Sequence, residues 1–138
     1  MKSEKLLILA SQTFIALSAL SIAYVSVMAI ADPQKVMSLV NVELNNTDAY
    51  SSIRGVYGGV GLTLTVSLIY LCLRNVRMGL GFLSILWGCY ALSRLTTMMI
   101  EGPLGEFGRQ WLTIESLFTL IAVTLLAALN RKRSLATA

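Results

Sequence analysis

Four apolar blocks dominate this chain, and each is close to the roughly 20 residues that an α-helix needs to cross the hydrocarbon of a membrane. They cover residues 6–31, 53–73, 79–100 and 111–129. Inside a bilayer, backbone polar groups are satisfied only within helices or closed barrels, and blocks this continuous lack the alternation of barrel strands. The sequence therefore predicts a single all-α domain, a polytopic membrane protein with four transmembrane helices in an antiparallel bundle.

The charged residues support this prediction and give it an orientation. Only 13% of the 138 residues are charged, about half of what a small soluble domain carries. The segments 32–52 and 101–110 are comparatively acidic. By the positive-inside rule, we expect these segments to be outer loops and both termini to be cytoplasmic, in a multi-pass protein of the inner (plasma) membrane. The basic residues at the inner ends of the blocks are Lys2, Lys5, Arg74, Arg77, Arg131, Lys132 and Arg133.

The first block has a competing interpretation. Lys2 and Lys5, an apolar run and the small residues around 29–31 also resemble a cleavable signal peptide. The apolar run is longer than the 7–15 residues of a typical signal-peptide core, so we expect the segment to remain as the first helix.

The first outer loop contains helix-start and turn chemistry. Asp32 and Pro33 are suited to the N-cap and the first position of a new helix. Residues 34–40 then predict a short interfacial helix with Val36, Met37 and Val40 towards lipid. The run 45–48 (Asn-Asn-Thr-Asp) is typical of a turn.

Composition excludes several classes of function. The chain has no histidine, which removes His-ligated haem, the usual zinc sites and His-based acid–base catalysis. Cys72 and Cys89 lie inside apolar blocks at no metal or redox spacing. We therefore expect no metal and no cofactor. The net charge of +4 comes from basic residues at the ends of the blocks, so it does not indicate nucleic-acid binding.

Small residues follow helical spacing in the second and third blocks. Such residues let the backbones of membrane helices approach closely, and Gly55 with Gly59 forms a GxxxG pair. Drawn as an α-helix, the second block puts Arg54, Gly58, Gly61 and Thr65 on one face. We expect these faces to pack within the bundle, although they suit a protein partner or a homo-oligomer equally well. The glycines concerned are Gly55, Gly58, Gly59, Gly61, Gly81 and Gly88.

Ionisable residues in or against the apolar blocks provide the candidate site. A charge near mid-bilayer costs roughly 2.5–3.5 kcal/mol on insertion scales, so it normally faces a bundle interior and has a partner. The predicted topology places Arg54, Arg94, Glu101 and Glu115 at similar depth towards the outer leaflet, where opposite charges can neutralise each other. Tyr57 lies one turn from Arg54 and can donate to either carboxylate. Alternatively, Arg94 extends its long side chain to the interface by itself.

This polar cluster suits three roles. The first is structural, a contact that fixes the order of the helices; because the chain carries no recognisable nucleophile or cofactor motif, we favour a non-catalytic structural or accessory component. The second is binding of membrane lipids or a small molecule, by a carrier or isomerase that uses the arginines as planar forks. The third is catalysis with Glu101 or Glu115 as proton carrier. An ion path is disfavoured because the inner half of the second and fourth blocks is almost entirely apolar.

The same residues carry a resemblance to a known family. The chain resembles small bacterial integral membrane proteins classed only as a domain of unknown function, through the run 53–59 (Ile-Arg-Gly-Val-Tyr-Gly-Gly), Arg94, the Glu101-Gly102-Pro103 sequence and Glu115. Members more often carry Asp where Glu101 stands. The resemblance implies a four-helix inner-membrane protein and no known activity. The layout is also similar to that of DoxX-like membrane proteins, without a motif that would transfer their function.

Overall fold

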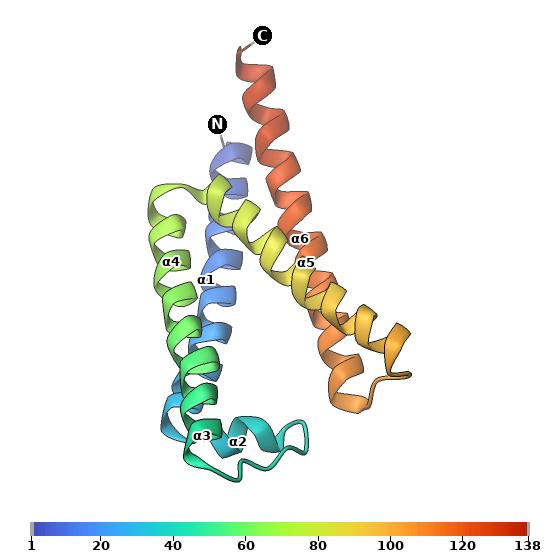
Figure 1. Cartoon of the computed structure of the whole chain (residues 1–138). Helices are drawn as coiled ribbons and strands as arrows, with labels where there is room; N and C mark the ends of the chain where they lie inside the picture. The colour runs from blue at the N-terminus through green and yellow to red at the C-terminus, as the bar shows by residue number, and fades with distance from the viewer. Residues whose placement is uncertain (1, 138) are drawn as a thin grey trace. The chain divides into compact units, whose positions relative to one another are not determined.

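The computed structural model describes residues 2–137, with side chains from 3 to 132, and the regular elements in that range are helical (Figure 1). In chain order they are α1 (Lys2–Ala31), α2 (Pro33–Ser38), α3 (Thr47–Ile53), η1 (Arg54–Val60), α4 (Gly61–Arg74), α5 (Val76–Ile100) and α6 (Glu106–Thr137).

Within the described residues, four helices are long and apolar enough to cross a membrane. Their apolar spans are Ser3–Ala31, Thr47–Arg74, Val76–Ile100 and Glu106–Lys132. The second is built from α3, η1 and α4, which follow one another without a break. These helices confirm the prediction of an all-α protein with four membrane-crossing helices.

Local capping chemistry explains where the helices begin and end. The Asp32 carboxylate accepts a hydrogen bond from the Lys35 backbone N–H (3.2 Å), which makes it the N-cap of α2 as predicted. The Asn75 side chain does the same for α5 through the Met78 N–H (3.1 Å). α5 stops at Ile100, shortly before Gly102, whose φ of 101° is a conformation that glycine adopts readily.

The second membrane helix begins earlier than the apolar block suggests. Asn46 accepts a hydrogen bond from the Ala49 N–H (2.8 Å) and caps α3, so the helix starts at Thr47 rather than near residue 53. The predicted turn at 45–48 therefore contains the start of this helix. η1 follows as a π-helical segment over the glycine-rich sequence, which α-helical spacing did not predict. Such wide turns are rare and are frequent at functional sites.

The chain divides into two compact units, described separately below. Residues 16–71 form the α3–α4 unit. In it the second half of α1 lies against η1 and α4, where Gly58 and Gly61 face Ile30 and Ser26.

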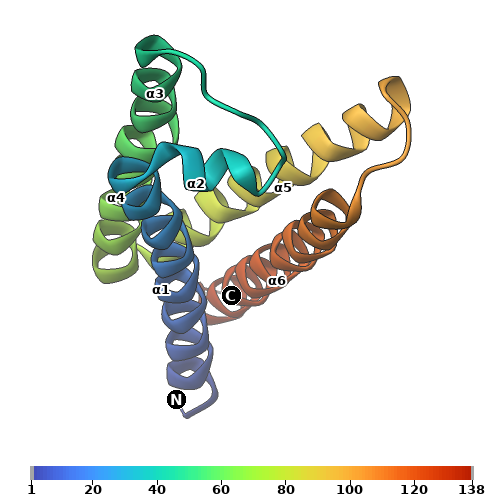
Figure 2. The same cartoon turned by 90° about the horizontal axis from the view of Figure 1, so that it is seen from below.

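The loop of the α3–α4 unit carries α2 and leads into α3 (Figure 2). Val36 and Met37 of α2 are buried and pack with Ala29 of α1, next to Leu44 and Ile53. The prediction that Val36 and Met37 face lipid was therefore wrong. The loop folds α2 back onto the end of α1, so these side chains form a small core, while Val40 remains exposed.

The α5–α6 unit combines residues up to 15 with residues from 72 onward. α5 and α6 pack against each other as an antiparallel hairpin (yellow and orange in Figure 1). The start of α1 joins them through Phe14, whose ring meets that of Phe118 edge to face at 5.4 Å. Gln12 holds the end of α4, because its side-chain amide donates to the Cys72 carbonyl (3.2 Å).

Candidate functional site

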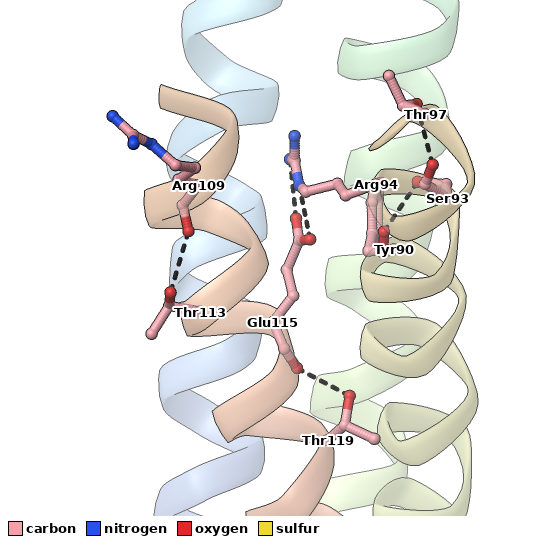
Figure 3. A network of polar contacts seen from close by, with 8 residues as sticks. All are labelled: Tyr90, Ser93, Arg94, Thr97, Arg109, Thr113, Glu115 and Thr119. Atoms are coloured by element: carbon pink, nitrogen blue, oxygen red, sulfur yellow. Dashed lines mark hydrogen bonds and ion pairs between the residues drawn. The ribbon is translucent and has the colours of Figure 1, made fainter. Parts of the chain in front are cut away.

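An ion pair between α5 and α6 is the centre of the candidate site. The Arg94 guanidinium binds the Glu115 carboxylate in a two-pronged arrangement, with Nε to Oε2 at 2.7 Å and Nη2 to Oε1 at 2.9 Å (Figure 3). Glu115 is only 2% exposed and Arg94 is 24% exposed. Paired forks of this kind are the strongest protein ion pairs, and they fix the orientation of both groups. The predicted meeting of opposite charges is confirmed for these two residues.

Small and aromatic side chains let the two helices approach around this pair. Ala91 is buried one turn before Arg94, and a Cβ added at Gly88 would lie 3.7 Å from the Thr119 methyl group. Trp87 is buried and meets Phe118 edge to face at 5.3 Å. Phe118 lies one turn beyond Glu115, so the ion pair is bordered by an aromatic cluster, which raises the cost of separating the charges.

The hydroxyl groups beside the ion pair form hydrogen bonds with the backbone of their own helices. Each hydroxyl donates to a backbone carbonyl three or four residues earlier in the same helix (Figure 3). The hydrogen bonds drawn to the Glu115 carboxylate come from Arg94. The bonds are Ser93 to Tyr90 (2.8 Å), Thr97 to Ser93 (3.0 Å), Thr113 to Arg109 (3.0 Å) and Thr119 to Glu115 (2.8 Å).

Arg54 lies in the other unit and has a different partner. It is the first residue of η1, and its Nε donates to the backbone carbonyl of Ile30 (3.1 Å), near the end of α1. A helix C-terminus carries unsatisfied carbonyls and partial negative charge, so an arginine is favoured there. Its guanidinium carbon lies 6.0 Å from the centre of the Tyr50 ring. That Arg54 joins Arg94 and Glu115 stays a prediction, because the residues belong to separate units.

The remaining residues of the predicted cluster lie at exposed positions. Glu101 caps the end of α5, where its backbone N–H donates to the Thr97 carbonyl (2.8 Å), and its side chain is exposed. Tyr57 of η1 is 41% exposed. Of the two carboxylates predicted to pair with Arg94, the structure therefore has Glu115 as its partner.

Apart from Gly88, whose neighbour Thr119 is described above, the glycines proposed for packing fall into two groups. Gly58 and Gly61 are buried, and a Cβ added at either would collide with α1: at Gly58 with the Ile30 side chain (2.6 Å), at Gly61 with Ser26 Oγ. By contrast, a Cβ added at Gly55, Gly59 or Gly81 would meet no atom within 4 Å.

Sequence reasoning missed Gln34, which organises the segment between α1 and α3. Its amide nitrogen donates to Ser38 Oγ (3.2 Å) and to the Val42 carbonyl (2.9 Å), and its amide oxygen accepts from the Leu44 N–H (2.8 Å). A surface hollow lies beside it, lined by Gln34, Ser38, Asn41, Val42 and Glu43. A single glutamine at the start of a short helix carries no sequence signal for such a role.

Among the described residues, no group of three or more Cys, Asp or Glu side chains is arranged to hold a metal ion. Cys72 and Cys89 are free thiols.

The fold and the ion pair together define a class: a small multi-pass membrane protein with a buried Arg94–Glu115 salt bridge between two of its spans. Residues 10–126 match the family described as "Domain of unknown function (DUF4345)", and the chain belongs to that family. No significant match was found among curated proteins or among solved structures.

Proposed function

We propose that the protein is a non-catalytic structural or accessory component of the bacterial inner membrane, with both termini in the cytoplasm. The orientation and the location rest on the positions of the basic residues and on the family resemblance. The function rests on one observation, the state of the Glu115 carboxylate.

Each oxygen of that carboxylate accepts one hydrogen bond from Arg94, and the side chain is 2% exposed. A general acid or base must reach the proton it transfers within hydrogen-bonding distance, and a binding carboxylate must offer an oxygen to its ligand. Because the Glu115 side chain is almost completely buried, the lone pairs that Arg94 leaves free are not exposed to a substrate or ligand while the pair is closed. Its best-supported role is to hold α5 and α6 in one register.

A second candidate function follows from the exposure of Arg94. Its side chain is 24% exposed, and a guanidinium has five N–H donors, of which Glu115 uses two in this structure. The remaining donors suit an anionic or polar headgroup, so a lipid- or small-molecule-binding carrier or isomerase is the alternative.

An apolar replacement of the whole pair separates the two functions. Removing both charges from a buried ion pair and filling the space with apolar side chains is often neutral or stabilising, whereas removing one charge is costly. For a structural role we expect Arg94→Met/Glu115→Leu to reach near-normal amounts of folded protein, and Arg94→Met alone to fall well below.

The measurements are the yield of monodisperse protein from membranes and the lipid retained, read by native mass spectrometry. Glu101→Gln is the matched control, because it removes an exposed carboxylate at the end of the same hairpin. Abundant folded Arg94→Met protein would contradict the structural role. Loss of a specific bound lipid from a well-folded double variant would support the alternative instead.

A further inference from the structure

Two half-buried cations, each held by a hydrogen bond, lie at the end of the α5–α6 unit opposite the Arg94–Glu115 ion pair. Arg77 lies in the first turn of α5, and its Nη2 donates to the Leu129 carbonyl of α6 (3.3 Å). Lys132 lies near the end of α6, and its Nζ donates to Ser3 Oγ of α1 (2.8 Å). Each side chain is therefore held in place by an oxygen acceptor from a different helix.

The two side chains meet α6 at neighbouring positions: Arg77 is bonded to Leu129, and Lys132 begins three residues further on. Leu129 and Lys132 are three residues apart on α6, which puts them on neighbouring positions of one helix face with a rise of about 4.5 Å. Because Arg77 is bonded to the Leu129 carbonyl, its guanidinium lies within about one helical turn of Lys132. Two like charges at one end of a helix hairpin repel, and an anion bound between them removes that repulsion.

The chain supplies no such anion among the side chains that the structure describes in this unit. The ion pair described there is Arg94–Glu115, at the other end of the hairpin. The acid nearest in sequence is Glu4, which is exposed at the start of α1. The charge excess grows further through the exposed Lys5, Arg74 and Arg131.

Position and donor count indicate which anion suits these two cations. Arg77 and Lys132 lie at the ends of the membrane spans that begin at Val76 and end at Lys132, where lipid phosphates are found. A guanidinium has five N–H donors and an ammonium three; each group spends one on the contact described, so several remain. Exposed apolar side chains lie near these groups in the chain: Met78 follows Arg77, Leu73 precedes it by four residues, and Leu6 comes three residues after Ser3.

We infer that Arg77 and Lys132 bind the phosphate of an anionic phospholipid, with its acyl chains along the neighbouring apolar surface. The lipid neutralises the two cations and thereby links α5, α6 and the start of α1. This site is distinct from the Arg94–Glu115 pair, and it is independent of whether that pair is structural or binds a ligand.

The test uses the full chain in mixed nanodiscs of phosphatidylglycerol and phosphatidylcholine, with the bound lipids counted by native mass spectrometry. A basic residue near an anionic surface contributes about 1 kcal/mol, which corresponds to about fivefold in binding. We expect the wild-type chain to retain phosphatidylglycerol selectively. Arg77→Gln or Lys132→Gln should lower that preference about fivefold, and the double variant roughly 25-fold.

The matched control is Lys35→Gln/Arg109→Gln, which removes the same net charge from exposed side chains elsewhere. It should keep the wild-type preference; an equal loss in this control would overturn the site. Added inorganic phosphate should not displace the lipid, and displacement at comparable concentration would assign the site to free phosphate and overturn the lipid proposal.

A second variant covers the case in which loss of Arg77 prevents folding. Arg77→Lys/Lys132→Arg keeps both charges and should retain the preference, while Lys132→Gln alone alters only the last turns of the α6 span. Retention of phosphatidylglycerol by Lys132→Gln at the wild-type level would contradict the inference.

Discussion

The two units of this chain hold their helices together by different chemistry. In the α5–α6 unit, a charged pair joins two helices: Glu115 is almost completely buried and is neutralised by Arg94. In the α3–α4 unit, the close contact is made by the absence of side chains, since Gly58 and Gly61 face Ile30 and Ser26 of α1 directly.

The two arginines show the same contrast. Arg94 forms two hydrogen bonds with a carboxylate, whereas Arg54 is exposed and donates to a backbone carbonyl at the end of α1. Lipid offers no hydrophobic driving force between helices, so membrane bundles rely on close packing and polar contacts. The ion pair depends on two side chains being present together. The glycine contact depends on the absence of a side chain at Gly58 and Gly61.

The largest expected effect breaks the ion pair from one side. Arg94→Met leaves Glu115 buried without a partner and should destabilise the protein by ~3–5 kcal/mol. Glu115→Leu should cost less than half of that, because the long, partly exposed Arg94 side chain can extend towards the interface. Thermal or denaturant unfolding in detergent measures both. Equal losses of unfolding free energy in the two variants would contradict this, because they would show that Arg94 cannot extend towards the interface when Glu115 is removed.

A smaller effect is expected from filling the glycine contact. Gly61→Ala puts a methyl group against Ser26 Oγ and Cβ, and overpacking of this kind costs about 1–3 kcal/mol. Gly59→Ala is the matched control: its Cβ meets nothing within 4 Å, and alanine favours a helix by about 0.5–1 kcal/mol over glycine. Unfolding of the two variants side by side gives the difference. If Gly59→Ala proved the more damaging, the open side of η1 would have to be covered by another chain.

The smallest effect concerns Arg54. Arg54→Gln removes a cation and a hydrogen bond from the C-terminal end of α1, which should cost about 0.3–1 kcal/mol. Arg109→Gln, in the first turn of α6, should change the free energy of unfolding by less than about 0.5 kcal/mol. The same unfolding assay applies. A loss at Arg54 as large as that of Arg94→Met would mean that Arg54 neutralises a buried carboxylate after all.

Sequence reasoning predicted the four membrane helices, the cap at Asp32 and the end of α5, since these depend on local apolar length and on capping residues. It also named Arg94 and Glu115 as members of one cluster. It left open whether Glu101 or Glu115 serves Arg94, because helical spacing orders side chains on one helix but does not fix its rotation against the next. The Ile30 carbonyl that binds Arg54 leaves no trace in the sequence, because every residue carries one.

The π-helical turn of η1 has a consequence for how the second membrane helix presents its side chains. A segment with i→i+5 bonds takes up one more residue than an α-helix of the same number of turns, and one residue corresponds to about 100° of rotation. The phase of the helix therefore changes across Arg54–Val60. Arg54 at the start of η1 reaches α1 at the Ile30 carbonyl, and Gly58 and Gly61 beyond it face the same helix. Shortening η1 by one residue should turn Arg54 by about 100° relative to Gly61 and carry its guanidinium away from that carbonyl.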